Sequence, residues 1–164
     1  MNKQDMELLS EVQRNTEMAM LAIETIADKV VNDDMSYQLE KQNLIFSNIH
    51  NHAVKELVDA NVRPDKNRTF QEMMLKSGIH MNTLFDVSTS HLADLMIRGN
   101  VKGITAMCRV LNRQKNIMYV PDRIKNKKMS MAMEVAQELI AFEENCIEKW
   151  RAFLWKNRTY ARLS

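Results

Sequence analysis

Apolar residues recur at every third or fourth position along the first 61 residues of the chain, which is the spacing that places side chains on one face of an α-helix. In residues 4–32 these positions are Leu9, Val12, Thr16, Ala19, Ile23, Ile26 and Val30. In residues 34–61 they are Met35, Leu39, Gln42, Phe46, Ile49, Ala53 and Leu57. The pattern predicts two long helices with a short reversal at Asp33 and Asp34, whose side chains are suited to cap the second helix.

Three further helices are predicted in the rest of the chain. Pro64 interrupts the pattern, and Thr69 to Glu72 has the form of a capping box, so a helix is expected over 69–98. Gly99 and Asn100 suit the left-handed turn that ends a helix, which predicts a separate short helix over 101–115. A loop around Pro121 then precedes a last helix over 128–156, with apolar positions at Ala132, Val135, Leu139, Phe142, Cys146, Trp150 and Phe153.

Glycine and proline are scarce, at 3 and 2 residues in a chain of 164. Strands and tight turns depend on these two residue types, so their scarcity favours helices. A chain of this length fits one domain that buries a sizeable core. We therefore expect a single all-α domain over 1–164, built as an antiparallel four-helix bundle with an additional short helix, whose packing position the pattern does not fix.

Charge is distributed unevenly, although the net charge is only +2. Residues 1–97 contain 9 Lys and Arg against 15 Asp and Glu, and residues 98–164 contain 14 against 6. The favoured interpretation is that acidic and basic helices pack together or that protomers pair, which predicts a homo-oligomer such as a dimer. The alternative is a nucleic-acid or anionic-membrane surface in the basic segment 98–128, for which the candidate binding residues are Lys125, Lys127 and Lys128.

The two cysteines, Cys108 and Cys146, each lie within an apolar helical stretch and are too few for a disulfide framework. Both are interpreted as reduced thiols in the core of a cytoplasmic protein. The N-terminus has no apolar run of signal-peptide length, and no segment approaches 18 uncharged apolar residues. Secretion and membrane spanning are therefore not expected.

The sequence contains no motif of a familiar catalytic site: no Gly-rich phosphate loop, Gly-x-Ser-x-Gly, Cys-x-x-Cys or His-Glu-x-x-His. Helical bundles also bind metals through inward Glu and Glu-x-x-His pairs, and Glu-x-x-His is absent too. The candidate metal ligands are His91 with Asp94, one turn apart, together with Glu138 and Glu143. The favoured interpretation of the glutamates is a solvated face, because they flank the apolar positions of the last helix.

Two stretches resemble a known class of proteins. The first runs from His91-Leu92-Ala93-Asp94 through Arg98-Gly99-Asn100 into Gly103-Ile104, and the second contains Ala136-Gln137-Glu138-Leu139 and Glu143-Glu144-Asn145-Cys146. Over residues 79–154 the chain is similar to small ferritin-like helical-bundle proteins of bacteria, most of which have no assigned function. The resemblance implies a core of two helical hairpins and, in the metal-using relatives, carboxylate-bridged iron. The missing Glu-x-x-His counts against an iron oxidase.

These observations favour a helical-bundle protein that acts by binding or as a structural component, and no catalysis is evident from the residues. The first alternative is a ferritin-like protein that binds iron or manganese, although no cofactor is predicted. The second is a protein that binds nucleic acid or an anionic surface through its basic segment. The residues themselves identify neither a ligand nor a partner.

Overall fold

In the computed structural model, the described residues are 1–63, 68–84, 86–117 and 129–160. They form five α-helices and no strand, which confirms the prediction of an all-α protein. The helices are α1 (Lys3–Ala27), α2 (Asp33–Asp59), α3 (Arg68–Asn82), α4 (Thr89–Ile117) and α5 (Met131–Tyr160). No helix among the described residues is both long enough and apolar enough to cross a membrane.

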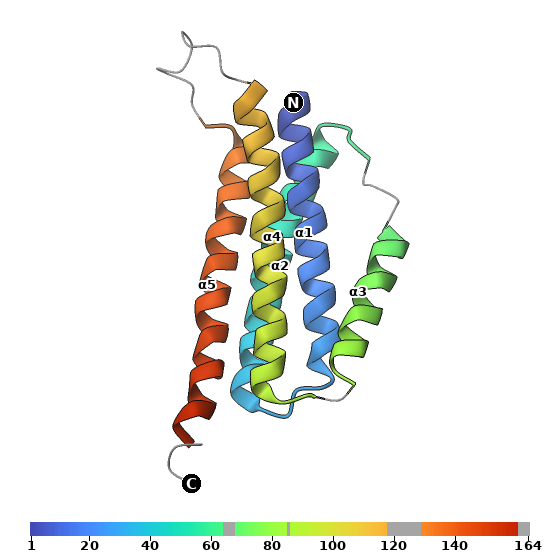
Figure 1. Ribbon diagram of the computed structural model, residues 1–164. Helices are drawn as coiled ribbons and strands as arrows, with labels where there is room; N and C mark the ends of the chain where they lie inside the picture. Colours follow the sequence, from blue (N-terminus) through green and yellow to red (C-terminus); the bar gives the residue numbers. More distant parts are fainter. Residues whose placement is uncertain (64–67, 85, 118–128, 161–164) are drawn as a thin grey trace.

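The four long helices, α1, α2, α4 and α5, lie side by side, and α3 packs on the outside against α1 (Figure 1). Helices α1 and α5 run in one direction and α2 and α4 in the other, so each of the tightly packed pairs α1–α2 and α4–α5 is antiparallel. Because α2 and α4 run in the same direction, the chain must return along the molecule between them. Helix α3 makes this return.

The core contains the apolar positions that helical spacing selects. All seven predicted positions of α2 are buried, from Met35 to Leu57. In α5, Leu139 and Trp150 are fully buried, and the Trp150 indole donates a hydrogen bond of 3.0 Å to the side-chain oxygen of Gln42. This buried bond joins α5 to α2 and pairs the side-chain oxygen of Gln42, whereas Nε2 of Gln42 is buried without a hydrogen-bond partner among the described residues.

Helix ends are capped by side chains that accept hydrogen bonds from free backbone amides. Asn2 caps α1 by accepting from the amide of Asp5, and Asn32 caps α2 by accepting from the amide of Met35. The prediction that Asp33 or Asp34 caps the second helix was therefore wrong by one residue, because both lie in its first turn. Both aspartates still stabilise the positive end of the helix dipole.

Two predicted boundaries in the middle of the chain were wrong. The expected helix 69–98 is broken after Asn82, and the expected break at Gly99 and Asn100 is absent, because α4 continues through both residues. No described glycine has a positive φ, and the buried side chain of Asn100 donates to the backbone oxygen of Met96 within the helix. Packing thus overrides the local preference of this pair for a helix end.

Two further predictions concern the second half of the chain. Cys146 is buried as expected, but Cys108 is exposed, so the prediction of a core thiol was wrong there. The last helix begins at Met131 and not at residue 128, and it extends to Tyr160. The predicted loop around Pro121 lies outside the described residues.

Candidate functional site

A cavity of about 700 Å³ lies between α1, α3 and α4. Its walls come mainly from these three helices, while α2 and α5 each contribute a single residue, Phe46 and Glu143. The apolar part of the lining includes Met18, Ile26, Leu75, Ile79, Leu95 and Met96. This volume is within the range of small-molecule sites in proteins, which are mostly apolar with a few polar groups.

Small residues create the space. Ala19 and Ala22 of α1 and Gly99, Gly103 and Ala106 of α4 all line the cavity. Larger side chains normally interdigitate and fill the groove between two neighbouring helices. The small residues at these positions leave that groove open. Small residues along two helices thus make room for the cavity, and α3 completes its wall.

Glu143 of α5 lies at the inner wall of this cavity and is only 1% exposed. The interpretation of Glu143 as part of a solvated face was wrong, whereas Glu138 and Glu144 are exposed as expected. Gly103 allows this burial, because a Cβ atom at that position would overlap Oε1 of Glu143 and would lie 2.7 Å from Oδ1 of Asn15. The close approach of α4 to the carboxyl thus requires glycine.

Asn15 of α1 and Glu143 form a buried polar pair with unused hydrogen-bonding capacity. Nδ2 of Asn15 and Oε2 of Glu143 are both buried and have no hydrogen-bond partner among the described residues. Burial raises the pKa of Glu143 to about 8, and the adjacent Asn15 side chain lowers it only in part. At neutral pH the carboxyl is therefore mostly protonated and can donate as well as accept a hydrogen bond.

Cationic side chains surround the outer part of the cavity. Arg14 of α1 and Arg98 and Lys102 of α4 all contribute to the lining, and all three are exposed. Arg14 forms an ion pair with Glu11, and Arg98 forms one with Asp94 one turn earlier on α4. The excess charge at this rim is therefore positive.

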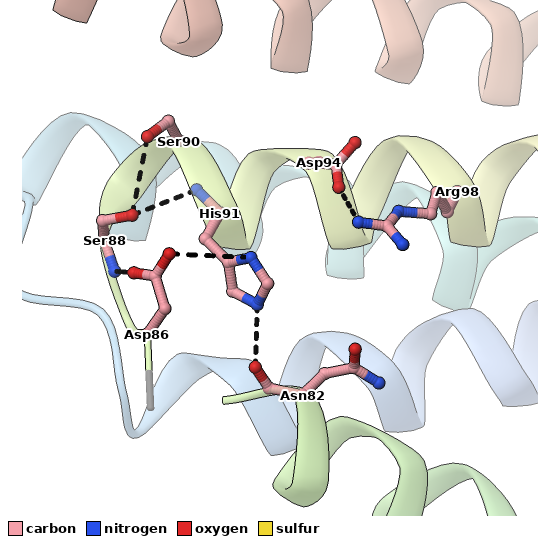
Figure 2. A network of polar contacts seen from close by, with 7 residues as sticks. All are labelled: Asn82, Asp86, Ser88, Ser90, His91, Asp94 and Arg98. Atoms are coloured by element: carbon pink, nitrogen blue, oxygen red, sulfur yellow. Dashed lines mark hydrogen bonds and ion pairs between the residues drawn. The ribbon is translucent and has the colours of Figure 1, made fainter. Parts of the chain in front are cut away.

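A polar network fixes the corner between α3 and α4 at the end of the cavity (Figure 2). Nε2 of His91 lies 2.8 Å from the backbone oxygen of Asn82, the last residue of α3, and so donates its proton there. The other ring nitrogen lies 3.8 Å from Oδ2 of Asp86. Hydrogen bonds from the backbone amide and hydroxyl of Ser88 lower the pKa of Asp86 and favour its charged form.

The candidate metal ligands do not come together in the structure. His91 contacts Asn82 and Asp86, while Asp94 pairs with Arg98. Glu143 lies beside Gly103, which is twelve residues, or about 18 Å of helix, beyond His91. Across the part of the chain that the structure describes, no three His, Cys, Asp or Glu side chains are grouped as metal ligands. Binding of iron or manganese stays an untested alternative.

The predicted basic surface is only partly described. Lys125, Lys127 and Lys128 lie outside the described residues, so their placement as binding residues is untested. Within α4, Arg98, Lys102, Arg109 and Arg113 are exposed, and Arg113 lies 3.4 Å from Glu7 of α1. Nucleic-acid or membrane binding through segment 98–128 and self-association as a dimer stay predictions.

Sequence reasoning missed Asn15 and Gly103 as site residues and misplaced Glu143. A signal for Glu143 was present, because it lies four residues after Leu139 and three before Cys146, both of which are buried. Residues three or four positions from buried residues lie on the buried face of a helix, so the spacing places Glu143 on that face as well as it places Phe142. Asn15 adjoins the buried Thr16, and only the packed neighbours distinguish it from a surface residue.

Comparison with protein-family models, with curated proteins and with solved structures finds no match to this chain. The function is therefore inferred from the cavity itself.

Proposed function

We propose that this protein binds a small amphipathic molecule in the cavity between α1, α3 and α4. One observation carries the proposal: two buried polar side chains, Asn15 and Glu143, line the cavity and keep atoms without hydrogen-bond partners. A buried unpaired polar group costs about 1–3 kcal/mol. A ligand that pairs with both atoms offsets this cost, which favours its binding.

The proposed architecture is an antiparallel four-helix bundle of the ferritin type, in which α3 is the connection between the two hairpins. Two features support this architecture. The hairpins α1–α2 and α4–α5 are each antiparallel, and α2 and α4 run in the same direction, which requires one long crossover. In this proposal the crossover also has a function, since α3 covers the ligand.

Displacement of Nile red, a neutral apolar fluorophore, tests the proposal. The purified protein is expected to bind the dye at one site per chain and to release it when decanoate or decanol is added. Ala22→Phe places a bulky side chain in the groove and should abolish dye binding. Ala152→Phe, at an exposed position of α5 away from the cavity, is the matched control and should leave binding unchanged.

The two variants distinguish dye binding in the cavity from dye binding elsewhere on the surface. Dye binding that Ala22→Phe and Ala152→Phe affect equally would place the dye elsewhere on the surface and contradict the proposal. Circular dichroism of both variants establishes that each is folded. Loss of binding in the folded Ala22→Phe variant alone supports the cavity between α1, α3 and α4 as the site.

A further inference from the structure

The two polar side chains of the cavity that keep unpartnered atoms, Asn15 and Glu143, lie at one end. Gly103 of α4 lies beside Asn15 of α1, and these two helices run in opposite directions. Ile26 is therefore about 16 Å from Asn15 along α1, and Leu95 is about 12 Å from Gly103 along α4 in the same direction. One end of the groove thus contains the buried polar pair, and a mostly apolar channel extends from it along α3 toward Asn82, the last residue of that helix.

The charged side chains of the lining lie mainly near the polar pair, except Arg98, which is about 7.5 Å from Gly103 along α4 toward Leu95. Glu11 and Arg14 come from α1, Arg98 and Lys102 from α4, and Glu143 from α5, whereas the lining residues of α2 and α3 carry no charge. Lys102 directly precedes Gly103 and so lies at the level of the polar pair. Arg14 and Arg98 are already paired with Glu11 and Asp94, so Lys102 is the lining cation without an ion pair among the described residues, and it favours a negatively charged group beside it.

We infer that the ligand is an anionic amphiphile, whose carboxylate contacts Asn15, Glu143 and Lys102 and whose elongated apolar body lies between α1, α3 and α4. This inference rests on the proposed function and specifies its ligand class. A carboxylate has two acceptor oxygens. One accepts a hydrogen bond from Nδ2 of Asn15 and the other from the protonated carboxyl of Glu143, so both unpartnered atoms become paired.

The same geometry disfavours the other ligand classes. An ammonium group at the polar pair would approach Lys102, which has the same charge, and it would bring no acceptor for the amide of Asn15. A neutral alcohol has one hydroxyl and gains nothing from Lys102. A single dissolved molecule can enter the cavity that Glu143 lines, whereas a membrane surface stays outside it.

Three ligands with the same ten-carbon chain test the charge: decanoate, decanol and decylammonium, each titrated at pH 7 and constant ionic strength. Decanoate is expected to bind about tenfold or more tightly than either of the others, as hydrogen bonds to a charged group contribute more than neutral ones. Equal or tighter binding of decanol or decylammonium, with loss in Ala22→Phe, would overturn the inference and leave the proposed function standing. Failure of all three to bind would overturn both.

Two variants test the assigned contacts. Lys102→Gln should weaken decanoate binding several-fold and leave decanol binding unchanged, while Lys41→Gln on the exposed surface of α2 should change neither. Asn15→Leu, which is similar in size, should weaken decanoate about tenfold without loss of folding, because it removes a buried amide that has an unpaired donor. Unchanged decanoate affinity in both variants would show that the carboxylate lies elsewhere.

Vesicles distinguish a dissolved ligand from a membrane. The protein should remain in the supernatant after sedimentation with vesicles of phosphatidylcholine and phosphatidylglycerol, both with and without decanoate. Co-sedimentation that depends on Lys102, combined with no affinity for decanoate, would assign the rim to a membrane surface and overturn the inference.

Discussion

Replacement of Glu143 by glutamine should make the protein more stable at neutral and alkaline pH. The pKa of Glu143 is raised to about 8 in the folded state, mainly by burial, against an ordinary value of 4.5. Between these values the unfolded chain releases a proton that the folded protein keeps. The stabilising effect of the protonated carboxyl is thus complete below pH 4.5 and is lost as pH rises through 8.

The size of the effect follows from the shift. Each pH unit within this window lowers the free energy of unfolding by about 1.4 kcal/mol, so the loss between pH 5 and pH 8 is about 3.5 kcal/mol. Glu143→Gln keeps the shape of the protonated carboxyl and cannot ionise. The variant and the wild type should therefore have similar stability at pH 5 and differ by about 3 to 4 kcal/mol at pH 8.

Urea denaturation at several pH values between 5 and 8, followed by circular dichroism, measures this difference. Glu138→Gln, an exposed position on the same helix, is the control and should follow the wild type. Parallel pH dependence of the wild type and Glu143→Gln would refute the reasoning, because it would mean that the carboxyl of Glu143 is solvated and ionised in the folded protein.

Three further predictions concern packing. Gly99→Ala should stabilise the protein by about 0.5 to 1 kcal/mol, because its Cβ atom meets open space. Gly103→Ala should be less favourable than Gly99→Ala by about 1 to 2 kcal/mol, because its Cβ atom would overlap Glu143. Equal effects of the two variants in chemical denaturation would contradict this. Trp150→Phe should cost about 1 to 3 kcal/mol in the same assay, since it leaves the side-chain oxygen of Gln42 buried without a donor, and an unchanged midpoint would contradict this. His91→Ala should accelerate amide hydrogen exchange in α3 while α2 stays protected, and uniform exchange would show that the corner is not held by His91.

Most of the fold could be predicted from the sequence because helical spacing is a local property. The inward positions of α2, from Met35 to Leu57, follow from periodicity alone, and all seven are buried. The boundary between α3 and α4 could not be predicted in this way. It depends on tertiary contacts, since packing keeps Gly99 and Asn100 helical while His91 and Ser88 fix the corner that follows Asn82.

The candidate site was less accessible to sequence reasoning for a physical reason. A glutamate between apolar positions is compatible with either a solvated or a buried side chain, and the choice depends on the neighbouring helix. Gly103 makes room for the carboxyl of Glu143, and Asn15 comes from a helix more than 100 residues away in the sequence. Such a combination is recognisable only after three helices have been placed together.

The most direct test of the account is an NMR titration of the side-chain carboxyl carbon of Glu143, with and without decanoate. The free protein should show a midpoint near pH 8, and decanoate should move it upward, because the ligand carboxylate accepts a hydrogen bond from the protonated form. A midpoint near the ordinary value of 4.5 that decanoate does not change would contradict both the buried carboxyl and its contact with a ligand.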